Sequence, residues 1–132
     1  MSDVANHRGL LAWKEAMRLA RMTYAATENF PRTEQFGLAL QLRRAAVSVA
    51  SNISEGAARG TSKDFGYFLS VALGSLAELD TQIELAESLG WLPEPAAISA
   101  QRTKVAQLTT KLRSAIGRRS KDGSRITDHG SR

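Results

Sequence analysis

Two charged residues stand where the helical pattern calls for apolar side chains, and they are the clearest candidates for a specific interaction. Arg43 lies on the arc opposite the polar stripe of its helix, and Glu78 interrupts an apolar stripe between Val71 and Leu85. If the chain folds back at Gly60, these two residues face each other. The pattern therefore predicts a partly buried ion pair. Losing one partner would leave an uncompensated charge, at a cost of about 3 to 5 kcal/mol.

The polar stripe itself is a second candidate for binding. At 100° per residue its members fall within a narrow arc of one helix. They are Gln41, Arg44, Ser48, Asn52, Glu55 and Arg59. Each member has a neighbour able to satisfy it, so the favoured interpretation is a hydrated or intersubunit seam. A ligand site is the alternative.

Catalytic chemistry has little to work with in this sequence. Histidine occurs only as His7 and His129, cysteine is absent, and no glycine-rich phosphate loop follows a strand. Serines such as Ser48 and Ser51 lack a histidine base. The Glu-x-x-His pairs of di-iron bundles are missing too. The sequence thus predicts a protein that is not an enzyme and has no metal or cofactor.

Basic residues are the third candidate group. The chain has a net charge of +5 and a pI near 10.1, which favours an anionic partner. The bases expected to contact phosphates lie in the last expected helix or in the tail that follows it. They are Arg102, Lys104, Lys111, Arg113, Arg118, Arg119 and Lys121. They predict weak, sequence-tolerant binding of RNA or DNA through phosphates, whereas a purely solvating basic tail is the alternative.

Four amphipathic segments would position these residues. Helices are expected from Leu10 or Leu11 to about Asn29, from about Thr33 to Gly60, from Thr61 to Leu89, and from about Pro93 to Gly117. Thr61 and Asp64 match a capping box. Short connections make neighbouring helices antiparallel, so the expected fold is an all-α, up-down four-helix bundle.

The expected domain organisation is a flexible N-terminus at 1–9, the bundle at 10–117 and a disordered basic tail at 118–132. The sequence has no run of 18 apolar residues, so no membrane span is expected. The lack of cysteine fits a cytoplasmic location. The second and third helices have two apolar sides each, too many for a small monomer. This favours a homo-oligomer in which one side meets another subunit.

Two long segments now carry a family resemblance. They read FGLALQLRRAAVSVASNISEGAARG and KDFGYFLSVALGSLAELDTQIELAESLGWL. They resemble the bacterial four-helix-bundle family encoded within intervening sequences of 23S ribosomal RNA genes, over about Leu11 to Leu92. The family's usual pattern has a proline where this chain has Ala50. The matching motif positions are Gly37, Leu38, Gln41, Arg43, Arg44, Ala45, Ser48, Asn52, Glu55, Gly56, Glu78 and Leu79.

The resemblance implies a homo-oligomeric bundle, with a pentameric ring favoured because such rings are known among relatives. The family is also similar to the accessory protein of diversity-generating retroelements, a basic pentameric barrel that binds nucleic acid and a reverse transcriptase. The first functional hypothesis is therefore a non-enzymatic ring-like scaffold that binds RNA or DNA weakly. The alternative is a protein-interaction module that binds a partner protein without nucleic acid.

Overall fold

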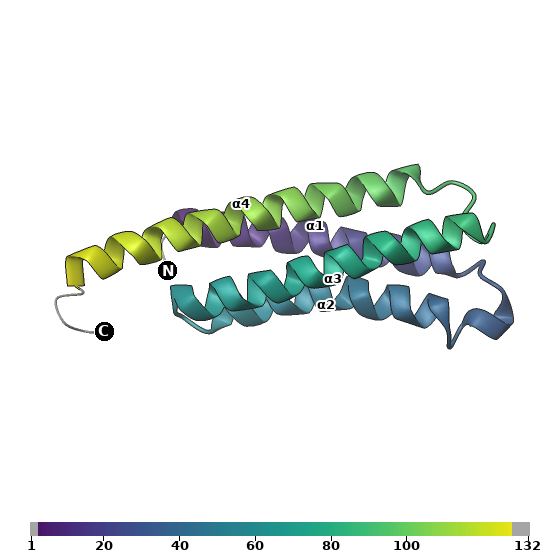
Figure 1. The fold of residues 1–132 in the computed structure, drawn as a ribbon, viewed down its shortest axis with the longest axis horizontal. Coiled ribbons are helices and arrows are strands. Elements are labelled where there is room, and N and C mark those ends of the chain that lie inside the picture. Colours follow the sequence, from purple (N-terminus) through teal and green to yellow (C-terminus); the bar gives the residue numbers. More distant parts are fainter. Residues whose placement is uncertain (1–2, 128–132) are drawn as a thin grey trace.

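The computed structural model describes the backbone of residues 3–127 and the side chains of residues 8–118. Four α-helices make up this part of the chain, and it contains no strand. They are α1 (Asp3–Thr27), α2 (Leu38–Ala58), α3 (Ser62–Ser88) and α4 (Ala96–Thr127), with a short 3₁₀ helix η1 (Arg32–Glu34) before α2. Successive helices run in opposite directions (Figure 1). The predicted all-α fold with four helices is confirmed.

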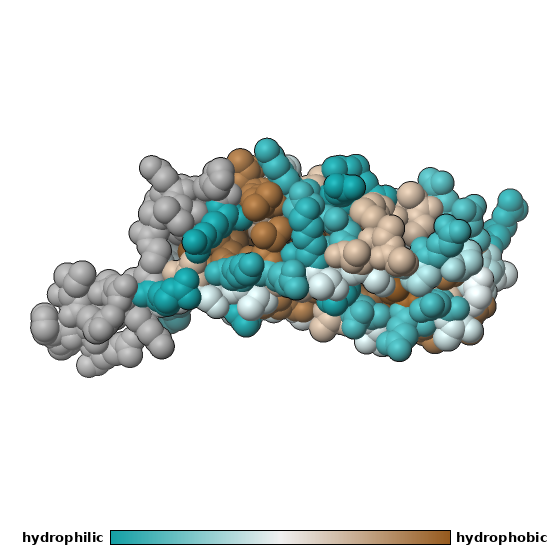
Figure 2. Space-filling model, turned by 90° about the horizontal axis from the view of Figure 1, so that it is seen from above, coloured by the Kyte–Doolittle hydropathy of each residue, from teal (hydrophilic) through white to brown (hydrophobic). Residues whose placement is uncertain are grey.

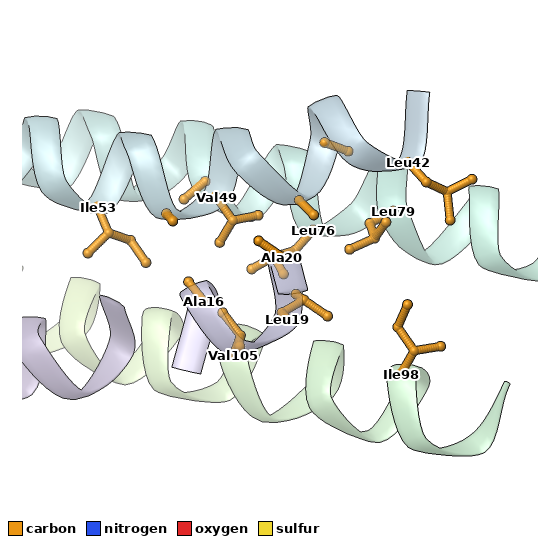
Figure 3. Close-up of a cluster of buried hydrophobic side chains, with 14 of the residues drawn as sticks. Ala16, Leu19, Ala20, Leu42, Val49, Ile53, Leu76, Leu79, Ile98 and Val105 are labelled. Atoms are coloured by element: carbon orange, nitrogen blue, oxygen red, sulfur yellow. The ribbon is translucent and has the colours of Figure 1, made fainter. Parts of the chain in front are cut away.

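The four helices form a closed cycle of contacts. Helix α2 packs on α1 and α3, and α4 packs on α3 and α1. Aliphatic side chains from all four meet in the middle, among them Leu19, Leu42, Leu76 and Val105, each at most 1% exposed (Figure 3). A core shared by every helix explains why none of these segments needs a disulfide to fold.

The buried side of α1 is made of small and aliphatic residues rather than of its aromatic ones. Trp13 and Tyr24 are 36% and 49% exposed, whereas Ala16, Leu19 and Thr23 are fully buried. The buried Thr23 hydroxyl is satisfied within the helix, since it donates to the Leu19 carbonyl at 2.8 Å. The larger aromatic side chains are left at the edge of the helix.

The turn between α2 and α3 follows the predicted chemistry. Gly60 has a φ of +83°, a left-handed conformation that glycine adopts without steric cost. Thr61 then caps α3, and its hydroxyl accepts a hydrogen bond from the Asp64 amide at 3.2 Å. Beside this turn a Cβ atom on Gly56 would overlap Phe65 and Phe68, so a side chain there would force its neighbours to move. The hairpin is therefore tight as well as short.

The connection between α1 and α2 differs from the prediction. A second helix was expected from Thr33, but α2 begins at Leu38 after the η1 turn. The Glu34 carboxylate accepts a hydrogen bond from the Leu38 amide at 3.1 Å and so pairs one of the free amides at the start of α2. Phe36 in this connection is 91% exposed.

The outer helices are longer than expected. Helix α1 begins at Asp3, within the segment 1–9 predicted to be flexible, and α4 continues past Gly117 to Thr127, within the predicted tail. A single glycine weakens a helix by only about 1 kcal/mol, so Gly117 does not end α4. The rest of the predicted tail, 128–132, lies outside the described residues. No helix in the described part is long and apolar enough to span a bilayer.

Candidate nucleic-acid interface

A groove between α1 and α4 brings three basic side chains together. Arg8 from α1 and Lys111 and Arg118 from α4 line a depression of about 570 Å³. We call it the cationic groove. Its full lining is Arg8, Leu11, Leu108, Thr110, Lys111, Leu112, Ser114 and Arg118. Figure 2, viewed from the α4 side, shows apolar surface flanked by hydrophilic side chains near the end where α1 begins.

The geometry of α4 explains this convergence. Lys111 and Arg118 are seven residues apart, two helical turns, so they project from the same face, with Ser114 between them. Among the described side chains, no carboxylate lies within 4.0 Å of Arg8, Lys111 or Arg118. Clustered guanidinium, ammonium and hydroxyl donors suit phosphate oxygens.

Other predicted bases are engaged within the chain. The Arg102 guanidinium lies 3.4 Å from an Asp80 carboxylate oxygen and donates to the Leu76 carbonyl at 3.4 Å. Arg113 donates to the Ser70 hydroxyl at 3.3 Å. Both contacts fasten α4 to α3, so these two bases are less available to an outside anion than Lys111. Arg119 and Lys121 belong to α4, but their side chains lie outside the described residues.

Lys104 is also committed to an internal contact. Its ammonium lies 3.3 Å from the Glu15 carboxylate, which accepts a second bond from the Gln101 amide at 2.9 Å. The Gln101 hydrogen bond, with the contact and charge of Lys104 and the charge of Arg18, lowers the pKa of Glu15 although burial opposes it. This cluster joins α1 to α4.

Arg8 is the member of the groove that the sequence did not reveal. It lies in the segment expected to be flexible, so no helical face was assigned to it. Once α1 is extended to Asp3, Arg8 and Leu11 are three residues apart and share a face. The three-residue spacing of Arg8 and Leu11 indicates a shared face only if the helix is known to begin before Arg8.

The predicted ion pair between Arg43 and Glu78 is not present, and this prediction is wrong. Arg43 instead donates from Nε to the Thr27 hydroxyl (2.8 Å) and from Nη2 to the Gln35 amide oxygen (3.1 Å). Its guanidinium also lies 5.3 Å from the centre of the Tyr24 ring, a cation–π distance. None of the ion pairs between described side chains involves Glu78. Arg43 therefore fastens α2 to the end of α1.

The polar stripe shows why the pairing fails. The observed register of α2 against α3 is close to the predicted antiparallel one, since the Ser48 and Ser75 hydroxyls are hydrogen-bonded at 2.8 Å. Arg44, however, lines the same groove as Glu78. Successive helical residues point about 100° apart, so when Arg44 faces α3, its neighbour Arg43 turns toward α1.

The first half of the stripe lines a groove inside the protomer. We call it the α2–α3 groove; it has a volume of about 380 Å³ and is lined by Gln41, Arg44, Ala45, Ser48, Ser75, Glu78 and Gln82. Beyond it, Asn52 donates to the Ser48 hydroxyl at 3.0 Å, and Glu55 pairs with Arg59 at 2.9 Å on the surface. The stripe is thus divided between a groove and an exposed i,i+4 pair.

The outer surface of α1 and α2 is apolar. Two adjoining depressions share Trp13 and Ser54. Together we call them the α1–α2 face, which is lined by Gly9, Leu10, Trp13, Met17, Ala20, Val47, Ala50, Ser51, Ile53, Ser54, Glu55, Ala57, Ala58 and Phe65. Leu10 and Val47 are 49% and 43% exposed. Apolar side chains around small residues are what a close helix contact uses.

Comparison with known proteins gave a family and a fold. Residues 8–114 match the family described as 23S rRNA-intervening sequence protein. A solved structure from Bacteroides thetaiotaomicron, a protein of unknown function from the S23 ribosomal protein family, superposes with a TM-score of 0.73 at 18% identity. The alignment covers 81% of this chain and 98% of that one, so it supports the bundle fold. The search of curated proteins found no match.

Proposed function

The chain belongs to the family of 23S rRNA-intervening sequence proteins, and for this member we propose a non-enzymatic, homo-oligomeric scaffold that binds RNA or DNA weakly. The pentamer remains the favoured assembly and the cytoplasm the favoured location. The binding is sequence-tolerant and uses the cationic groove. The convergence of Arg8, Lys111 and Arg118 on one depression carries this proposal.

The groove suits a phosphate backbone better than a base. Its cations come with two exposed α4 hydroxyl residues, Thr110 and Ser114, and none of the described side chains that line it is aromatic. Base stacking on aromatic rings is the usual source of affinity for unpaired bases. Contacts through phosphates alone give binding that varies little with sequence and falls steeply with salt.

Assembly would multiply a weak contact. The α1–α2 face offers an apolar surface for another copy. It lies on α1 and α2, whereas the cationic groove lies on α1 and α4. Each protomer in a ring then adds its own groove to the same nucleic acid chain. Linking weak sites in this way raises the overall affinity through effective concentration.

Fluorescence anisotropy with labelled oligouridine and with a mixed-sequence DNA duplex tests the binding. The observed association constant should fall as the salt concentration rises from about 50 to 200 mM. The slope of its logarithm against the logarithm of the salt concentration should be near about −0.7 for each phosphate contact on the single strand. The triple variant Arg8→Gln, Lys111→Gln, Arg118→Gln should bind more weakly and reduce that slope. Lys14→Gln, Arg21→Gln, Lys63→Gln removes three exposed bases outside the groove and is the matched control.

Equal loss of affinity in the two triple variants would reject the cationic groove as the site. A salt-independent affinity would reject phosphate contacts altogether. Native mass spectrometry on the same samples measures the assembly. Trp13→Glu on the α1–α2 face should lower the oligomeric mass if that face is buried between copies, and an unchanged mass would reject this interface.

A protein-interaction module without nucleic acid is the second candidate. Phe36 supports it, because a 91% exposed aromatic side chain in a connection held by Glu34 is an unusual surface feature. This function predicts that a partner protein still binds the groove triple variant and is lost in Phe36→Ser. The nucleic-acid proposal predicts that RNA or DNA binding is weakened in the groove triple variant and is unchanged in Phe36→Ser.

A further inference from the structure

The α2–α3 groove has two chemically different walls. Gln41 and Arg44 project from α2, and Glu78 and Gln82 project from α3, at spacings of three and four residues that keep each pair on one helical face. The hydrogen-bonded Ser48 and Ser75 close one end of the groove. Next to this end the α2 wall presents a guanidinium, and the α3 wall presents a carboxylate.

Several of these groups are not satisfied by the protein. No ion pair within 4.0 Å joins Arg44 to Glu78 among the described side chains, although both line the same 380 Å³ groove. The side-chain oxygen of Gln82 is buried and accepts no hydrogen bond. Buried polar atoms are nearly always paired in folded proteins, and this unpaired acceptor belongs to a side chain that lines the groove.

We infer that the α2–α3 groove binds a small zwitterion of the α-amino-acid class. Its ammonium group donates to the Glu78 carboxylate, and its carboxylate accepts from Arg44 and Gln41. The two charges of a zwitterion are fixed a few ångströms apart, which matches a cationic wall opposite an anionic wall. The volume lies in the lower part of the range of ligand sites, roughly 300 to 1,000 Å³, as a small ligand requires.

This site is independent of the proposed nucleic-acid contact. The cationic groove lies between α1 and α4, whereas this groove lies between α2 and α3, the other pair in the cycle of four helices (Figure 1). No residue is shared between the two linings. The loss of one activity therefore does not require the loss of the other.

Saturation-transfer NMR of the full-length protein with an equimolar set of L-amino acids identifies a ligand, and calorimetry then measures its affinity. Arg44→Gln and Glu78→Gln should each weaken binding of that amino acid about tenfold or more, because each removes a charge-assisted hydrogen bond. Both side chains are exposed, so the variants should keep the wild-type circular dichroism spectrum. Arg59→Gln, at the residue that follows α2, and Glu84→Gln, on α3, lie outside the groove and should bind like wild type.

Matched ligands separate the two walls. The corresponding amine without its carboxylate should bind weakly and be indifferent to Arg44→Gln, and the corresponding acid without its amine should be indifferent to Glu78→Gln. The inference is overturned if no amino acid binds, or if all four variants bind equally. It is also overturned if Arg44→Gln and Glu78→Gln change only the oligomeric mass, since the groove is then a subunit seam.

Discussion

Replacing Gly56 with alanine tests whether α2 and α3 touch as closely as the structure shows. A Cβ atom at this position would lie 2.8 Å from the Phe68 Cβ, 2.9 Å from the Phe65 Cδ1 and 3.4 Å from the Phe65 Cα. The first and last of these atoms are fixed to the backbone of α3, so side-chain rotation cannot relieve the overlap. The helices must move apart.

Two opposing effects set the size of the change. Alanine favours a helix interior over glycine by about 0.5 to 1 kcal/mol. Forcing an extra methyl group into a packed site costs roughly 1 to 3 kcal/mol. The overlap should win, so we expect Gly56→Ala to lower the free energy of unfolding by about 1 to 2 kcal/mol.

Gly74 provides the matched control on α3. A Cβ atom there meets nothing within 4 Å, and the residue is exposed. Gly74→Ala should therefore raise the free energy of unfolding by about 0.5 to 1 kcal/mol. The two substitutions are chemically identical and should act in opposite directions.

Urea unfolding followed by circular dichroism measures both variants. Protein concentration must be held constant, because oligomerisation shifts the apparent stability by mass action. A Gly56→Ala variant as stable as wild type, or stabilised like Gly74→Ala, would refute the close approach of α2 and α3. Opposite shifts of the two unfolding midpoints would support it.

Two further substitutions test the polar contacts between helices. Arg43→Ala should lower the free energy of unfolding by about 1 to 3 kcal/mol, because it removes the hydrogen bonds from Arg43 to the Thr27 hydroxyl and the Gln35 amide oxygen. Glu78→Gln should change it by less than about 0.5 kcal/mol, and a double-mutant cycle showing strong coupling between Arg43 and Glu78 would contradict the structure. The lowered pKa of Glu15 means that its contribution is complete above its ordinary value of 4.5 and is lost as the pH falls through the lowered value. The stability difference between wild type and Glu15→Gln should therefore shrink in acid, and a difference that stays constant from about pH 6 to pH 3 would contradict the Gln101 and Lys104 contacts of Glu15.

Local sequence chemistry was enough to predict the hairpin of α2 and α3. Gly60 and Thr61 define the turn through their own backbone and capping preferences, so the register of the helices that follow is nearly fixed. The bond between Ser48 and Ser75 agrees with that register. The register of α2 against α3 is set by the turn between them, and that turn depends only on residues close together in the sequence.

The direction in which a side chain points was harder to predict. Arg43 belongs to a helix with two packed neighbours, and the period alone does not say which neighbour occupies which side. Its actual partners include Gln35, which the sequence placed inside a helix but which lies in the connection after η1. Likewise, the cationic groove depends on Arg8 and α4 meeting across the bundle. Both features come from tertiary packing that no single segment encodes.

The two ends of the bundle differ in kind. At one end lie the Gly60 turn and the cationic groove, and at the other lie Phe36, the Arg43–Tyr24 contact and the tilted pair of Phe30 and Trp91 rings, 5.9 Å apart. Rotation about a single axis keeps like ends together. In a ring whose axis is parallel to the helices, every cationic groove would lie toward one rim and every Phe36 connection toward the opposite rim. Such a ring could hold a nucleic acid on one side while a protein docks on the other, without competition between them.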